Sequence, residues 1–103
     1  MATRTFPLQT NGQRSYIRLT EILDFFEPEI FGGNLKTNRA PQMASIQYGS
    51  QAAFNDDIPS NHNFFRTRKR GVVTKFLDDH KIEKGSLIMI ERLAPFTYRF
   101  MPG

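Results

Sequence analysis

Apolar and polar side chains alternate in several short stretches of this chain, and a two-residue period is typical of strands with one buried face. The pattern predicts about seven short strands separated by polar turns. Extended segments are expected at residues 5–9, 16–19, 42–48, 51–54, 64–67, 87–93 and 96–101. Asn11-Gly12 provides the positive-φ positions of a tight turn, so the first two strands are expected to pair as a hairpin.

Two other segments have helical spacing. In residues 20–26, Ile22 and Phe26 fall on one face, Thr20 is a candidate N-cap, and Pro28 ends the helix. In residues 70–80, apolar residues stand in pairs four positions apart. These pairs are Val72/Phe76 and Val73/Leu77. Many strands with few helices predict a mostly β (α+β) fold, a seven-stranded open pseudobarrel with two short helices.

Composition limits the chain to one ordered domain, residues 1–103. Its 11.9 kDa suffices for a single core, and an apolar share of 39% with ten Phe residues is too high for a disordered chain. No Cys is present for a disulfide or a thiolate metal site. No apolar run reaches the ~20 residues that span a bilayer. A cytoplasmic protein without membrane contact is therefore expected.

Positive charge is concentrated in particular stretches. Fourteen Lys and Arg residues against ten Asp and Glu residues give a net charge of +4. Residues 1–20, 30–55 and 66–75 contain bases but no acid. Segregation of this kind produces a basic face, the electrostatic feature that binds nucleic-acid phosphates.

Two blocks of the sequence carry a family resemblance. The first is Tyr16-Ile17-Arg18-Leu19 with Phe25-Phe26 and Gly32. The second is Arg70-Gly71-Val72-Val73-Thr74-Lys75-Phe76-Leu77, followed by Ile82-Glu83-Lys84-Gly85-Ser86-Leu87-Ile88-Met89-Ile90-Glu91. These blocks resemble the opening and the signature of the plant B3-type DNA-binding domains, whose fold also serves as an effector domain in some restriction endonucleases. Val72 replaces the usual Trp and Ser86 the usual Asp, which favours a microbial relative associated with a restriction system.

Members of this family grip the DNA major groove with two loops. The resemblance implies a first arm at residues 10–15 and a second arm at residues 55–68. The polar composition of both segments suits that role, because Asn and Gln pair with adenine and Arg pairs with guanine. The candidate DNA-binding residues of the two arms and their bases are Asn11, Gln13, Arg14, Arg18, Asn61, His62, Asn63, Arg66 and Arg68.

Three further bases lie at or within the second predicted helix. Lys69, Arg70 and Lys75 are expected to neutralise phosphates, which fixes register without specifying sequence. The helix dipole disfavours cations at a helix start. A phosphate held between Lys69, Arg70 and the first helix N–H groups accounts for this placement.

Patterns for catalysis and metal binding are weak. His62 and His80 are the only His residues, and without Cys they make a poor metal site. The acids of Asp56-Asp57 and Asp78-Asp79 are adjacent, so their side chains diverge on a strand or a helix. The sequence contains no Gly-rich phosphate loop and no nucleophile elbow. We therefore expect a protein that is not an enzyme and holds no cofactor.

The sequence thus predicts a sequence-specific module for double-stranded DNA, the targeting domain of a restriction-type or regulatory system, with a nuclease or another polypeptide as its partner. Two alternatives stay open. A single-stranded nucleic-acid-binding barrel would stack bases on Phe96, Tyr98 and Phe100, although strand spacing favours these rings as core. A protein-interaction or adaptor domain would use Phe64-Phe65 as its anchor.

Overall fold

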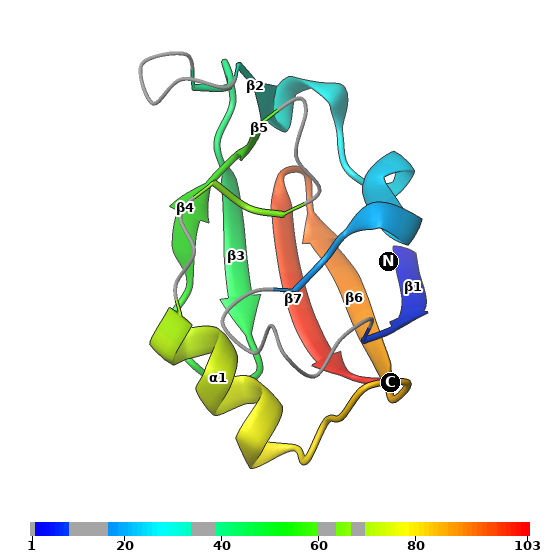
Figure 1. The fold of residues 1–103 in the computed structure, drawn as a ribbon. Coiled ribbons are helices and arrows are strands. Elements are labelled where there is room, and N and C mark those ends of the chain that lie inside the picture. Colours follow the sequence, from blue (N-terminus) through cyan, green and yellow to red (C-terminus); the bar gives the residue numbers. More distant parts are fainter. Residues whose placement is uncertain (1, 9–16, 34–38, 60–63, 67–69) are drawn as a thin grey trace.

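The computed structural model describes residues 2–8, 17–33, 39–59, 64–66 and 70–103, and strands dominate this part of the chain (Figure 1). The strands are β1 (Ala2–Pro7), β2 (Phe31–Gly32), β3 (Ala44–Tyr48), β4 (Phe54–Asp56), β5 (Ile58–Pro59), β6 (Leu87–Ala94) and β7 (Thr97–Pro102). The helices are α1 (Arg70–Asp79) and two 3₁₀ helices, η1 (Thr20–Phe25) and η2 (Pro28–Ile30). The expectation of a mostly β fold with few helices is confirmed, and the described strands do not close into a barrel.

The strands are distributed over two sheets. Five of them form a mixed sheet in the order β1-β6-β7-β3-β4, and β2 pairs with β5 in a separate parallel sheet. The β6–β7 hairpin is antiparallel, and Phe96 takes a positive φ of 58° in its turn. On its other edge β7 runs parallel to β3, so the strand nearest the end of the sequence lies in the middle of the sheet.

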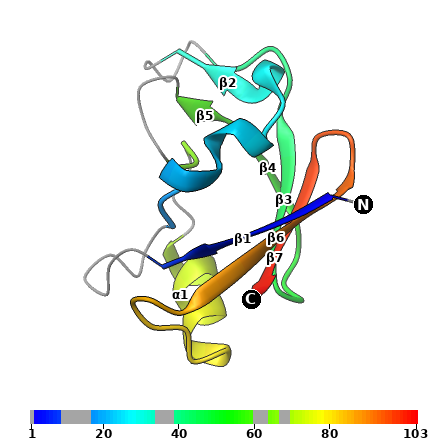
Figure 2. The ribbon, with the colours of Figure 1, turned by 90° about the vertical axis from the view of Figure 1, so that its right-hand side faces the viewer.

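The core lies against one face of the five-stranded sheet. Figure 2 shows η1, the β2–β5 pair and α1 on the same side of that sheet. Along β6, Ile88 and Ile90 are fully buried on this side, whereas Met89 between them is partly exposed on the other. This alternation is the expected signature of a sheet with one packed face and one solvated face.

The aromatic stripe of β7 belongs to the core, as its strand spacing predicts. Tyr98 and Phe100 are 1% and 0% exposed. The Phe100 ring stacks on Tyr48 of β3 with centroids 4.8 Å apart, and it meets Phe6 of β1 edge-on at 6.3 Å. Phe96 is only partly buried and packs against the margin of the same cluster. Rings from three strands therefore meet around Phe100.

Helix α1 confirms the helix predicted at residues 70–80. Val73, Phe76 and Leu77 occupy one helical face and are all buried in the core. The side-chain amide of Gln51 donates a hydrogen bond of 2.8 Å to the Val72 carbonyl, which attaches the first turns of the helix to the segment after β3. Among the residues that the structure describes, neither this helix nor the 3₁₀ helices have the length and apolar character needed to cross a membrane.

The hairpin predicted at the N-terminus is wrong in its described part. Residues 17–19 belong to no strand, Tyr16 lies outside the described residues, and β1 pairs along its whole length with β6. Ile17 and Leu19 are nevertheless buried. Their alternation arises because two side chains of an irregular segment enter the core, not because the backbone pairs with β1.

The helix predicted at residues 20–26 is a kinked 3₁₀ helix instead. Thr20 does not cap it, since Leu19 holds the cap position without a side-chain hydrogen bond, and Ile22 leaves the helical region with φ −128° and ψ 15°. Phe25 and Phe26 are both buried. Neighbouring side chains diverge by about 100° on an α-helix, so the backbone becomes extended at Phe26 to bury both rings.

Two predictions in the middle of the chain are also shifted. The strand expected at residues 51–54 begins only at Phe54 as β4, and the segment expected as a polar loop from residue 55 contains the end of β4 and all of β5. Asp56, Asp57, Ile58 and Pro59 are all buried there. The described beginning of the predicted second arm is therefore part of the packed scaffold.

Replacing Phe100 with Ala should lower the free energy of unfolding by about 3–5 kcal/mol, because the ring contacts three other aromatic side chains and the cavity cannot collapse. Urea unfolding followed by circular dichroism measures this. Leu87→Ala is the control, since Leu87 is 52% exposed and its loss should cost far less. Equal losses in the two variants would contradict the placement of the core.

Candidate nucleic-acid interface

Most of the predicted DNA-binding residues fall outside the described residues, and for them the prediction stands as made. These are Asn11, Gln13, Arg14, Asn61, His62, Asn63, Arg68 and Lys69. Arg70 is described only as the first residue of α1. The structure describes the side-chain surroundings of Arg18, Lys75 and Arg66. The first two side chains are exposed, whereas that of Arg66 is nearly buried.

Arg18 and Lys75 are exposed. Arg18 points to solvent between the buried side chains of Ile17 and Leu19, which fix the backbone on either side of it. Lys75 lies on the outer face of α1, where its ammonium is 2.9 Å from the carboxylate of Asp79 one turn later. Both side chains of that pair are more than half exposed, so water screens the attraction and it stabilises the helix only weakly. Both cations are accessible to a phosphate.

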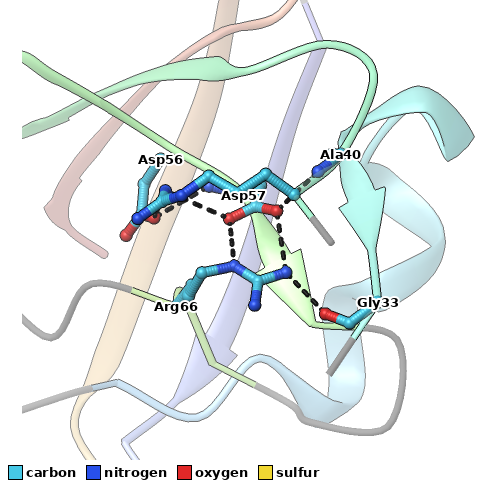
Figure 3. Close-up of polar contacts among 6 residues, drawn as sticks. Gly33, Ala40, Asp56, Asp57 and Arg66 are labelled. Carbon is cyan, nitrogen blue, oxygen red and sulfur yellow. Dashed lines mark hydrogen bonds and ion pairs between the residues drawn. The ribbon is translucent and has the colours of Figure 1, made fainter. Parts of the chain in front are cut away.

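Arg66 is in a different environment, because its side chain is only 7% exposed. Its Nε donates a 2.7 Å hydrogen bond to Asp57 Oδ1, and its Nη2 donates to Asp57 Oδ2 at 3.0 Å and to the Gly33 carbonyl at 2.6 Å. Figure 3 shows this two-pronged contact between guanidinium and carboxylate. The backbone N–H of Arg66 also donates to the Asp57 carbonyl at 2.8 Å. These contacts of Arg66 are directed into the protein.

The carboxylate of Asp57 has further partners. It is fully buried and accepts a 2.8 Å hydrogen bond from the backbone N–H of Ala40 (Figure 3). Burial alone would raise the pKa of Asp57. The hydrogen bonds from Arg66 and Ala40 and the charges of Arg66 and Arg39 outweigh burial and hold the pKa below its ordinary value. We refer to Asp57 and Arg66, with the Gly33 carbonyl and the Ala40 N–H, as the Asp57–Arg66 brace.

The residues of the brace flank two polar segments of the sequence. Gly33 and Ala40 lie on either side of residues 34–38, and Asp57 and Arg66 lie on either side of residues 60–63. The short strands β2 and β5 are parallel, with Phe31 opposite Ile58, so the chain leaves both strands in the same direction. In parallel sheets the segments that follow the carboxyl ends of adjacent strands are neighbours and commonly form ligand sites.

Sequence reasoning missed the burial of Asp56 and Asp57, which it placed in a polar loop. Both residues are 0% exposed. One signal was present: these are the only two acids between Glu29 and Asp78, a stretch that also contains seven bases. Isolated acids within a basic segment are candidates for buried ion pairs, because a buried carboxylate requires a compensating charge.

The aromatic residues named for the alternative functions are largely internal. Phe65 is 5% exposed and packs edge-on against Phe26 and Phe100. Tyr98 is equally inaccessible. In the described part of the chain, Leu87 is the only large apolar side chain that is substantially exposed. Phe65, Tyr98 and Phe100 are therefore inaccessible to a partner in this structure, whereas Phe64 and Phe96 are partly exposed.

Charge is divided between the described scaffold and the segments outside it. Of the fourteen Lys and Arg residues four lie outside the described ranges, whereas all ten Asp and Glu residues lie within them. The four bases are Arg14, Lys36, Arg68 and Lys69. Ten bases and ten acids lie in the described ranges, and residues 9–16, 34–38 and 67–69 contain the other four bases and no acid.

Comparison of the chain with models of protein families, with curated proteins and with solved structures finds no match. Within the described ranges, no group of three or more His, Asp or Glu side chains is arranged to hold a metal ion.

Replacing Asp57 with Asn should lower the free energy of unfolding by about 3–5 kcal/mol, because the buried guanidinium of Arg66 loses the negative charge to which it is hydrogen-bonded. Urea unfolding at neutral pH measures the loss. Asp24→Asn is the matched control: Asp24 also pairs with an Arg, but its side chain is 73% exposed, so the unfolding midpoint should hardly move. A loss no larger than that of the control would show that the brace contributes little to the fold.

Acid should weaken the fold through Asp57. Its pKa in the folded protein lies below the value of about 3.9 expected in the unfolded chain. The carboxylate therefore contributes stability above about pH 4, and this contribution is lost as the pH falls through the folded pKa. Unfolding free energies measured between neutral and acidic pH should fall more steeply for the wild type than for Asp57→Asn. Parallel profiles for the two proteins would contradict the lowered pKa.

Proposed function

We propose that this chain is a non-catalytic module that binds double-stranded DNA sequence-specifically through the major groove. Residues 10–15 and 55–68 form its two arms, of which the second starts from a buried base at residues 56–59, and the scaffold is an open pseudobarrel of the B3-like type. The module serves as the targeting domain of a restriction-type or regulatory system in the cytoplasm. A nuclease or another polypeptide is its partner.

The observation that carries this proposal is the distribution of charge along the sequence. Residues 9–16, 34–38 and 67–69 contain four bases and no acid, whereas the described ranges contain ten bases and ten acids. A phosphate backbone attracts such segments over a distance of about a Debye length, about 10 Å at 0.1 M salt. The Asn, Gln, His and Arg side chains in the same segments have the donors and acceptors that read base edges.

The described residues refine the assignment within the second arm. Arg66 directs its guanidinium toward Asp57 and Gly33, so we assign it to supporting the arm. Arg68 of this arm and Lys69, which directly follows it, stay assigned to contacts with DNA. The exposed Lys75 on α1 contributes a phosphate contact, which positions the module without specifying sequence.

The duplex form of the nucleic acid is favoured over single strands for a specific reason. Single-strand binders stack successive bases on exposed aromatic rings. The rings of Tyr98, Phe100 and Phe65 are buried in the core. Groove readout by polar loops requires no exposed ring.

Titration of the protein with labelled duplex DNA of randomised sequence, in parallel with single strands, tests the proposal. Fluorescence anisotropy at several salt concentrations should show preferential duplex binding that weakens steeply as salt increases. Selection from the random pool should then yield a consensus with a Kd between about 10⁻⁸ and 10⁻¹¹ M. Binding of neither form at low salt would overturn the proposal.

Two substitutions divide the roles within this experiment. Arg68→Ala should cost about 1–3 kcal/mol on the selected sequence if Arg68 reads a guanine. Lys75→Ala should weaken all sequences alike and reduce the salt slope by about one. A sequence-selective loss for Lys75→Ala would contradict its assignment to the backbone.

A further inference from the structure

Arg39 is held by ion pairs with two buried acids, and within the described ranges its guanidinium forms no hydrogen bond. Its Nη1 lies 3.7 Å from Asp57 Oδ1 and 3.8 Å from Asp56 Oδ1, and both of these carboxylates are fully buried. These are ion-pair distances beyond hydrogen-bonding range. The guanidinium donates no hydrogen bond to the described residues, and the side chain is 44% exposed.

Arg66 provides the contrast within the same cluster. It pairs with the same Asp57 carboxylate, but through two hydrogen bonds, and it is nearly inaccessible. The two carboxylates are balanced by two guanidiniums, of which one faces inward and the other faces solvent. Attraction to a buried, immobile pair of acids restricts where the Arg39 guanidinium can lie, although the rest of its surface meets water.

The position of Arg39 adds a second argument. Its neighbour Ala40 donates its backbone N–H to Asp57, and Gly33 accepts from Arg66, so the brace fixes the chain beside Arg39 against the root of the second arm. Arg39 is therefore exposed beside the residues that join Asp57 to Arg66, and a phosphate bound on that side of the described scaffold lies within its reach.

We propose that Arg39 is a further phosphate-contacting residue, oriented by Asp56 and Asp57. A guanidinium presents several N–H donors in a fixed plane, which matches the oxygens of a phosphodiester. The carboxylates act as positioning residues, because they hold the plane before DNA arrives. This inference rests on the proposed function, and it adds to the two arms a contact from the scaffold itself.

Arg39→Ala tests the inference in the duplex titration. One lost phosphate contact should reduce the slope of log K against log salt by about 0.9, which corresponds to a roughly eightfold loss of affinity at 0.1 M salt for every sequence. Arg4→Ala is the matched control: Arg4 is 40% exposed and pairs with a single Asp, but it lies on β1 at the opposite edge of the sheet. It removes the same charge and should leave the slope unchanged.

Arg39→Ala also removes a counter-charge from buried acids, so thermal unfolding is used to check that the variant is folded. A second experiment, chemical modification of arginines, uses the wild-type protein. Phenylglyoxal modifies accessible guanidiniums, and peptide mass mapping reports the modification of each Arg. Duplex DNA should protect Arg39 but not Arg4. Duplex binding with no protection of Arg39 and no change of slope in a folded Arg39→Ala would overturn the inference alone, whereas failure of the wild type to bind duplex DNA would overturn the proposed function as well.

Discussion

The Asp57–Arg66 brace is the interaction on which the arrangement of the chain around the β2–β5 pair depends. A fully buried carboxylate is stable only when charge and hydrogen bonds replace the water it has lost. Asp57 meets this requirement with Arg66 and with a backbone N–H from a third segment. Arg66 in turn satisfies the Gly33 carbonyl. Four separate points of the chain are therefore located relative to one another by one ion pair.

The need for such a polar centre follows from the short length of β2 and β5. Each has two residues, and a sheet of that size satisfies few backbone groups. The carbonyl of Gly33 directly follows β2 and the N–H of Ala40 lies four residues before β3, and neither residue belongs to a described strand. A carboxylate and a guanidinium supply the missing acceptor and donor, whereas an apolar pair of the same volume would leave both backbone groups unpaired.

Elements whose burial pattern is recorded in neighbouring residues were predictable from the sequence. Elements that depend on pairing between distant parts of the chain were not. The periodic segments that became β3, β6, β7 and α1 were found to within one or two residues, because burial on one face is recorded locally in the order of residues. The partner of β1 was missed, since choosing β6 over a nearby hairpin depends on contacts from the far end of the chain. The β2–β5 pair is too short to have a period at all.

The candidate site shows the same division. The basic and polar character of the connecting segments could be read directly, but the roles of Arg66 and Arg39 could not. Both are Arg residues in polar, basic surroundings. What separates them is the distance to Asp57 and the degree of burial, and these come from bringing residues 39, 57 and 66 together in space.

The central position of β7 has a consequence for how the molecule folds. This strand joins the β6–β7 hairpin to β3, and the β3–β7 contacts bridge a long stretch of intervening sequence. Closing so large a loop precedes any gain from the pairing, so folding should be slow compared with that of a helical bundle of equal size. During synthesis, β1, β3 and the aromatic rings of the core would wait for β7 to emerge before they could be covered. The nascent chain would meanwhile expose apolar surface, and it is in this interval that aggregation is the greatest hazard.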